Sequence, residues 1–151
     1  MDIFYLENIE TSTNDNNNFR HVIYTSPNKV QLVLMSIKPG EDIGLEQHTN
    51  TDQFIRIEKG TGKSVFGKDK NKLEEKPLND GSIVLIPANV WHNIINTGTE
   101  DLKLYTIYSF AQHEDQLIEA TKPLNQDGGE RMFYKKYIKY KHKYNNLKNH
   151  M

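Results

Sequence analysis

The sequence predicts an all-β protein, either an antiparallel sandwich or a closed barrel. Eight or so short runs of β-branched, aromatic and other apolar residues alternate with Gly, Pro and Asn turn signals. No helical period is visible before about residue 114. The length of 151 residues is that of about one domain. Short, evenly spaced strands in a chain of this size are typical of sandwiches and jelly rolls.

The expected elements follow in order along the chain. Residues 11–18 are polar and rich in Asn, which predicts a loop. The run 30–37 is apolar on both faces, as expected for a strand with one face inside a barrel and the other covered. The expected strands are 21–24, 30–37, 54–57, 64–66, 72–76, 83–86, 91–95 and 102–110.

Composition narrows the class of protein. The hydrophobic fraction is 36% and the charged fraction 26%, which indicates a globular protein. The chain has no run approaching the roughly 18 apolar residues of a membrane span, and its N-terminus does not resemble a secretory signal, so a cytoplasmic location is expected. It has no cysteine, which excludes disulfides, thiolate metal ligands and thiol nucleophiles.

The C-terminal part differs from the rest. Residues 131–151 hold seven Lys and Arg and no acid, and without them the formal charge falls from −1 for the whole chain to −8 for residues 1–130. Phe133, Tyr137, Tyr140, Tyr144 and Leu147 share one helical face. We expect a barrel domain over 1–115, a linker or strap over 116–130, and a basic tail over 131–151. The tail is expected to be a short helix that docks on the acidic body or on another subunit, or a mobile segment. The alternative is that its lysines bind nucleic acid or an anionic membrane.

Two distant segments carry the side chains that are best suited to metal binding or catalysis. Glu46 and His48 lie two positions apart, so in a strand they point to the same face. Gln53 follows a polar turn, and His92 begins a later strand. A barrel can bring inward side chains from several strands to one point. A carboxylate and two imidazoles gathered in this way predict a metal site.

These residues give the chain a resemblance to the cupin superfamily. The first cupin motif is Gly, five residues, His-x-His, three or four residues, Glu, six residues, Gly, and here it aligns with Gly40, Glu46-Gln47-His48, Gln53 and Gly60. The second is Gly, five residues, Pro-x-Gly, two residues, His, three residues, Asn, and it aligns with Gly81, Pro87-Ala88-Asn89, His92 and Asn96. Seven of the ten defining positions match, in two motifs that lie within 40–60 and 81–96. The resemblance implies a jelly-roll barrel and a homodimer.

Three positions depart from the cupin pattern. Asn89 replaces a turn glycine, and Asn is the residue after glycine that best tolerates a left-handed backbone. Glu46 replaces the first His ligand and Gln53 replaces the Glu, so the site keeps a charge of −1. The expected ligands are therefore Glu46, His48, His92 and Gln53. Two imidazoles and one carboxylate suit a divalent ion, with Fe, Mn, Ni, Zn and Cu all compatible.

Other residues carry weaker signals. His113 follows the last strand and is expected to be solvated, unless residues 111–123 fold back across the barrel mouth. His21 is expected to be structural. Arg56 alternates with Ile55 and Ile57, so it should face away from the metal site. Trp91, Tyr105 and Tyr108 could line a pocket, but aromatic strand residues usually belong to the core.

Three functions remain open on the sequence alone. The resemblance implies a metal-dependent enzyme on a small molecule, either an Fe(II) dioxygenase or an isomerase or epimerase, with Glu46 as the catalytic candidate. The second possibility is a barrel that binds a small ligand or metal without turnover. A purely structural assembly unit is disfavoured by the metal motifs. Nucleic acid is not expected to be a partner, because only the basic tail favours it and no recognition motif is present.

Overall fold

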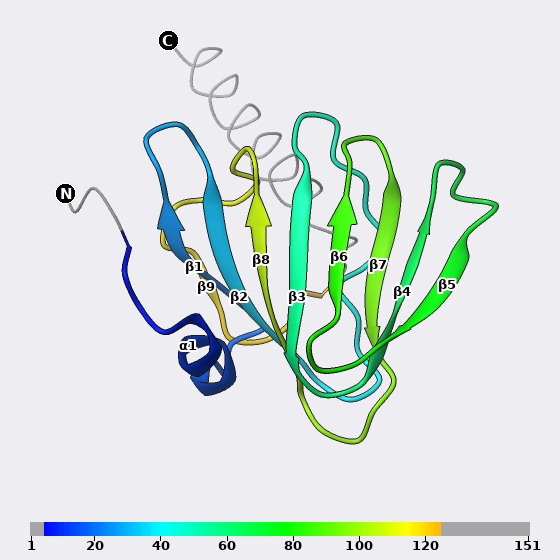
Figure 1. The fold of residues 1–151 in the computed structure, drawn as a ribbon, viewed down its shortest axis with the longest axis horizontal. Helices are drawn as coiled ribbons and strands as arrows, with labels where there is room; N and C mark the ends of the chain where they lie inside the picture. Colours follow the sequence, from blue (N-terminus) through cyan, green and yellow to red (C-terminus); the bar gives the residue numbers. More distant parts are fainter. Residues whose placement is uncertain (1–4, 125–151) are drawn as a thin grey trace, which may run out of the picture.

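The protein consists of two antiparallel sheets that face one another, with one short helix beside them (Figure 1). The computed structural model describes residues 5–124. The larger sheet has the strand order β6-β3-β8-β2-β1-β9, and the smaller one has the order β5-β4-β7. The elements are α1 (Ile9–Asp15), β1 (Arg20–Thr25), β2 (Gln31–Ile37), β3 (Gln53–Lys59), β4 (Gly62–Gly67), β5 (Glu74–Leu78), β6 (Ile83–Ile86), β7 (Trp91–Asn96), β8 (Leu102–Tyr108) and β9 (Ile118–Glu119). The predicted all-β, jelly-roll architecture is confirmed.

The hydrophobic core lies between the two sheets and follows from strand alternation. Ile55 and Ile57 point inward from β3, Leu104 from β8 and Ile94 from β7, and all four are fully buried. β2 is buried along almost its whole length, as its apolar sequence predicts. Each of these side chains contributes roughly 1.5–3 kcal/mol by leaving water, which makes this row the main stabilising contact between the sheets.

The prediction of a loop over residues 11–18 was wrong at its start, because residues 9–15 form α1. The helix begins where the Asn8 side chain accepts a hydrogen bond from the backbone N–H of Thr11, at 2.9 Å. Thr13 is fully buried where the helix packs against β2, β3 and β8. Tertiary packing of a polar seven-residue segment leaves no periodic apolar signal in the sequence, so the helix could not be seen there.

The segment after β8 returns to the barrel and is held against it by Gln31. The Gln31 side chain is fully buried, donates to the carbonyl oxygen of His113 at 2.9 Å, and accepts from the backbone N–H groups of Gln112 and His113 at 3.1 Å. Farther along, β9 pairs with β1. Of the strap or linker predicted over 116–130, the described residues reach 124, and the tail over 131–151 lies outside them.

Among residues 5–124, no helix is long and apolar enough to cross a membrane. The only α-helix that the structure assigns in this range is α1, with seven residues.

The turn between β6 and β7 positions the second motif. Asn89 has a φ of 69°, in the left-handed region, as its place at the family's glycine position predicted. Its backbone N–H donates to the carbonyl oxygen of His48 at 2.7 Å, and its own carbonyl oxygen accepts from the Gln47 side chain at 2.7 Å. The turn thus joins the two motif segments directly.

Substitutions at Asn89 should follow the backbone conformation. We expect Asn89→Val to lower the free energy of unfolding by about 1–2 kcal/mol, because a β-branched residue is strained at positive φ. Asn89→Gly should change it by less than about 0.5 kcal/mol. Urea denaturation measures both, with Asn71→Val as the control at an exposed turn residue. Equal effects of the valine and glycine variants would contradict this account.

Candidate metal centre

Three residues of the two motif segments meet inside the barrel. Glu46, His48 and His92 are only 4%, 2% and 1% exposed. One ligand atom from each lies within 4.8 Å of the other two. Nε2 of His48 and Nε2 of His92 both lie 3.3 Å from the same Glu46 oxygen, Oε1. Two imidazoles and a carboxylate therefore converge at one point, as predicted.

Backbone pairing explains why residues so far apart in the sequence meet. The chain from Gly40 to Glu46 runs antiparallel to β7, and Ile43 donates its N–H to Ile94 at 3.0 Å. Glu46 and His92 exchange two backbone hydrogen bonds, each 2.9 Å long. The prediction that Glu46 and His48 lie in a strand was wrong in form, because this segment makes isolated bridges only. Its extended backbone still sends both side chains to the same interior.

The tautomer of His92 is determined by its neighbour. Its Nδ1 lies 2.9 Å from the carbonyl oxygen of Val90, which can only accept, so Nδ1 carries the hydrogen. In a neutral ring, Nε2 then directs a lone pair into the site. This arrangement of an imidazole oriented by a backbone carbonyl is the usual one for metal-binding histidines.

The buried carboxyl of Glu46 is kept ionised by its surroundings. Burial alone would raise its pKa, but hydrogen bonds and positive charge from His48 and His92 outweigh burial and hold the pKa well below its usual range. A neutral Nε2 facing a carboxylate oxygen at 3.3 Å would place two acceptors against each other. The site therefore requires a shared proton or a cation at its centre.

The donor set fits a divalent cation. Ions bound at about 2.0–2.2 Å by imidazole and carboxylate hold neighbouring donors roughly 3–3.5 Å apart. The two 3.3 Å distances between Glu46 and the imidazoles lie in that range. Two His and one carboxylate, without sulfur, match the preferences of Fe, Mn, Ni, Zn and Cu.

Gln53 lies at the start of β3 and faces the same interior. It is 3% exposed, and its Nε2 donates to the hydroxyl of Thr106 on β8 at 2.9 Å. Its Oε1 is buried and has no hydrogen-bond partner within residues 5–124. A buried amide oxygen without a donor costs roughly 1–3 kcal/mol, which a cation or a ligand donor would offset. Gln53 as a ligand stays a prediction.

The interior next to His48 contains a second polar pair. The Tyr108 ring packs edge-on against His48 at 5.5 Å between centroids, and its hydroxyl lies 3.4 Å from Nε2 of His113. The prediction of a solvated His113 was wrong, because Gln31 holds the backbone of residues 112–113 over the barrel and buries the ring. Only the tertiary fold shows this, since Gln31 and His113 lie far apart in the sequence. Burial, reinforced by Arg20, lowers the pKa of His113 well below its usual range.

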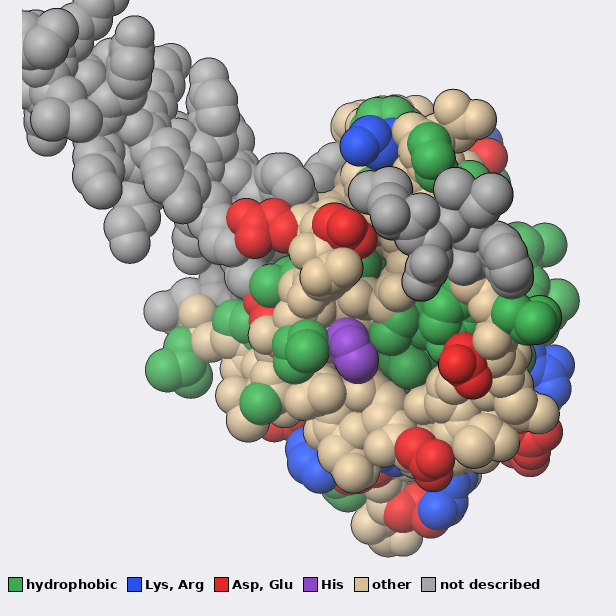
Figure 2. Space-filling view, turned by 90° about the vertical axis from the view of Figure 1, so that its left-hand side faces the viewer, with side chains coloured by type: hydrophobic (Ala, Val, Ile, Leu, Met, Phe, Trp, Pro, Cys, Tyr) green, Lys and Arg blue, Asp and Glu red, His purple; other side chains and the backbone are tan. Residues whose placement is uncertain are grey.

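The remaining candidates lie away from the centre. Arg56 is on the outer side of β3 as predicted, where Nε donates to Glu58 at 2.6 Å. His21 is partly exposed on β1. Figure 2 views the molecule from the side of β1 and shows charged side chains scattered around hydrophobic ones. Sequence reasoning missed Thr106, whose only signal is its inward place between Leu104 and Tyr108.

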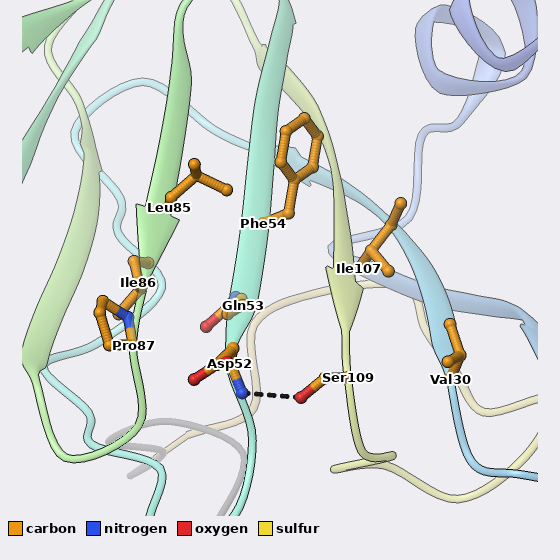
Figure 3. Close-up of a pocket in the computed structure, with 9 residues that line it drawn as sticks. All are labelled: Val30, Asp52, Gln53, Phe54, Leu85, Ile86, Pro87, Ile107 and Ser109. Atoms are coloured by element: carbon orange, nitrogen blue, oxygen red, sulfur yellow. Dashed lines mark hydrogen bonds between the residues drawn. The ribbon is translucent and has the colours of Figure 1, made fainter.

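A separate hollow of about 450 Å³ lies on the outer face of the larger sheet. Phe54, Leu85 and Ile107 line it, and each alternates with an inward residue, so these three side chains lie on the outer face of the sheet. Gln53 also borders the hollow (Figure 3).

Comparisons with known proteins agree with the geometry. The family model described as Cupin domain matches residues 33–108. Uncharacterized protein L612 of Acanthamoeba polyphaga mimivirus is 47% identical over 147 residues, which cover 95% of this chain and 90% of that protein. Uncharacterized protein YrkC of Bacillus subtilis is 44% identical, and the match covers 78% of this chain and 63% of that protein.

A solved structure is similar to this chain in both fold and sequence. The crystal structure of BH2720 from Bacillus halodurans superposes with a TM-score of 0.75 at 42% sequence identity, covering 78% of this chain and 89% of that chain.

The burial of His113 predicts how the stability of the protein depends on pH. A histidine whose pKa is lowered by folding is neutral in the folded protein while the unfolded chain takes up a proton below about pH 6.5. Its contribution to stability is thus complete above that pH and is lost as the pH falls. Between pH 7 and 5.5, the free energy of unfolding should fall by about 1 kcal/mol more in the wild type than in His113→Gln. If urea titrations show that both proteins lose the same free energy of unfolding between pH 7 and 5.5, the burial of a neutral His113 is contradicted.

Proposed function

This chain belongs to the cupin family, and on that premise we propose that it is a metal-dependent enzyme acting on a small molecule. Glu46, His48 and His92 would hold one divalent ion, with Gln53 as a fourth, weaker oxygen ligand. The observation that carries the proposal is the convergence of two buried Nε2 atoms on one carboxylate oxygen, each at 3.3 Å.

The proposed ligands would leave part of the coordination sphere of the bound cation free to react with a substrate. Two imidazoles and one carboxylate leave positions open for a substrate, as in non-haem Fe(II) sites. When bound, the ion would supply Lewis acidity toward a substrate oxygen. The His92 ring, held by the carbonyl oxygen of Val90, would keep its lone pair on the site throughout a catalytic cycle.

Glu46 is assigned here to metal binding. A general base needs a free lone pair, whereas the Glu46 oxygen Oε1 lies 3.3 Å from both Nε2 atoms, at the point where the ion would bind. This position favours a metal ligand. Proton abstraction by Glu46, the catalytic role expected from the sequence, is the alternative, and it would require the carboxylate to leave the ion.

Two reaction classes fit such a site, a dioxygenase and an isomerase or epimerase of sugars or small carbonyl compounds. Metal-dependent O₂ consumption with candidate substrates separates them, because only the first class uses O₂. Conversion of substrate under anaerobic conditions supports the second class.

A non-catalytic binding module is the second candidate. The observation that favours it is the near-complete burial of all three residues, which would protect a captured ion from exchange. Tight retention of metal and ligand, with no turnover of any substrate tested, would select this function. A homodimer and a cytoplasmic location also remain proposals, drawn from the resemblance and the composition.

Loss of either imidazole should remove the metal. Protein purified without chelator or nickel resin is expected to hold about one divalent ion per chain by elemental analysis. His48→Ala and His92→Ala should each lower this to a small fraction, because one carboxylate and one imidazole, with only the weak Gln53 amide beside them, hold a divalent ion poorly. Gln47→Ala is the control, since Gln47 lies between the ligands in sequence and contacts the turn instead. Unchanged metal content in both histidine variants would reject the site.

The amide of Gln53 offers an independent test. Gln53→Glu adds a second buried negative charge beside the ion and should tighten divalent binding about tenfold or more, equivalent to about 1.4 kcal/mol. Gln53→Leu should weaken it. Competition with a chelator measures both affinities. If neither variant differs from the wild type, Gln53 is not a ligand.

A further inference from the structure

A second pocket, here called the seam pocket, lies where the two sheets part. It occupies about 460 Å³ between β4 and β5 of the smaller sheet and β6 of the larger one. This size lies in the roughly 300–1,000 Å³ range of small-molecule pockets. Its walls are largely apolar, formed by Phe66, Leu78, Val84, Ile86 and Val90.

Three polar side chains interrupt this apolar lining, and one of them, Ser82, already donates its hydroxyl hydrogen to the Asn79 side chain at 3.1 Å. Ser64 is 2% exposed, and its hydroxyl has no hydrogen-bond partner within residues 5–124. Lys76 lies directly opposite Ser64 in the β4–β5 pair, so both side chains leave the sheet on the same face. The Lys76 ammonium stands 6.0 Å from the Phe66 ring centroid and has no carboxylate partner in the described part of the chain.

We propose that the seam pocket binds a small organic carboxylate with an apolar ring or chain. The carboxylate would accept hydrogen bonds from the Ser64 hydroxyl and the Lys76 ammonium, the two groups that lack an acceptor. Hydrogen bonds between charged groups are roughly twice as strong as neutral ones, and a buried hydroxyl without a partner is costly. The apolar body would lie against Phe66, Val84 and Ile86.

The pocket borders the candidate metal centre. Phe66 pairs with His92 across β4 and β7, and Ile86 pairs with Gln53 across β6 and β3. A ligand held by its carboxylate at Ser64 and Lys76 would therefore extend its other end toward the metal centre, where a substrate would carry the oxygen that binds the ion. In this respect the inference rests on the proposed function, because it names the substrate class of that site.

Lys76 has a competing explanation. β5 is an edge strand, and a charged lysine that is exposed there, as Lys76 is, discourages pairing with other chains. That explanation predicts no ligand and no effect of Ser64.

Matched probes test the inference on the full chain. Benzoate carries the carboxylate and an apolar ring, benzyl alcohol keeps the ring without the charge, and acetate keeps the charge without the ring. Titrations followed by protein NMR give a dissociation constant for each probe, and chemical shifts of the lining residues give its place. We expect benzoate to bind at least tenfold more tightly than either of the other two.

Variants locate the carboxylate. Lys76→Met should weaken benzoate about tenfold and leave benzyl alcohol unchanged, and Ser64→Ala should weaken benzoate about threefold. Lys72→Met is the control, an exposed lysine of the same hairpin outside the pocket. Equal binding of benzoate and benzyl alcohol, no binding of benzoate, or no effect of Lys76→Met would each overturn the inference.

Metal analysis of the same samples keeps the two proposals distinct. Benzoate binding to protein without metal would refute the proposed function and leave the carboxylate site standing. Full metal content without benzoate binding would refute the carboxylate site and leave the proposed metal-dependent function standing.

Discussion

The pairing of the segment before His48 with β7 is the contact on which the site depends. Glu46 and His92, forty-six positions apart in the sequence, exchange both of their backbone hydrogen bonds. This register places a carboxylate beside an imidazole without any side-chain adjustment. The turn at Asn89 adds a second connection, through the carbonyl oxygen of His48. Because these are backbone contacts, substitution of a ligand would remove its chemistry and leave the scaffold in place.

Because the paired residues are buried, the charges of their side chains must balance one another. Three ionisable groups with 4% exposure or less share one small volume, although moving charge out of water is costly. The arrangement is stable only if positive charge sits between the carboxylate and the imidazoles, carried by protons or by a cation. The interior continues through Tyr108 to His113, where burial favours the neutral ring. Charge is thus concentrated at Glu46 and its two imidazoles, and the largely buried ion pair between Arg20 and Glu119 is a second charged group beside β1.

The fold places residues that are neighbours in the sequence on different surfaces: the core, the hollow on the outer face and the seam pocket. Inward residues of β3 form the core and end at Gln53, while outward residues such as Phe54 line the hollow on the sheet's outer face. The seam pocket lies where β6 leaves an open edge against β4 and β5, and inward residues such as Leu78 and Ile86 form part of its wall. Its lining residues come from three strands and the turns that follow β5 and β6, over the 26 positions that separate Ser64 from Val90.

The sequence by itself determined most of the strand pattern, the family, and the set of Glu46, His48 and His92 that meets inside the barrel, because these depend on short-range spacing within each motif. Two-residue alternation predicted the inward set, and the motif spacing identified Asn89 as a left-handed turn residue. Only the tertiary structure decided the helix at residues 9–15, the burial of His113 and the partner of Gln53. Each depends on contacts between distant residues, such as Gln31 with His113, which leave no local periodic trace. The local pattern thus specifies the elements, whereas the environment of each polar group depends on the packing around it.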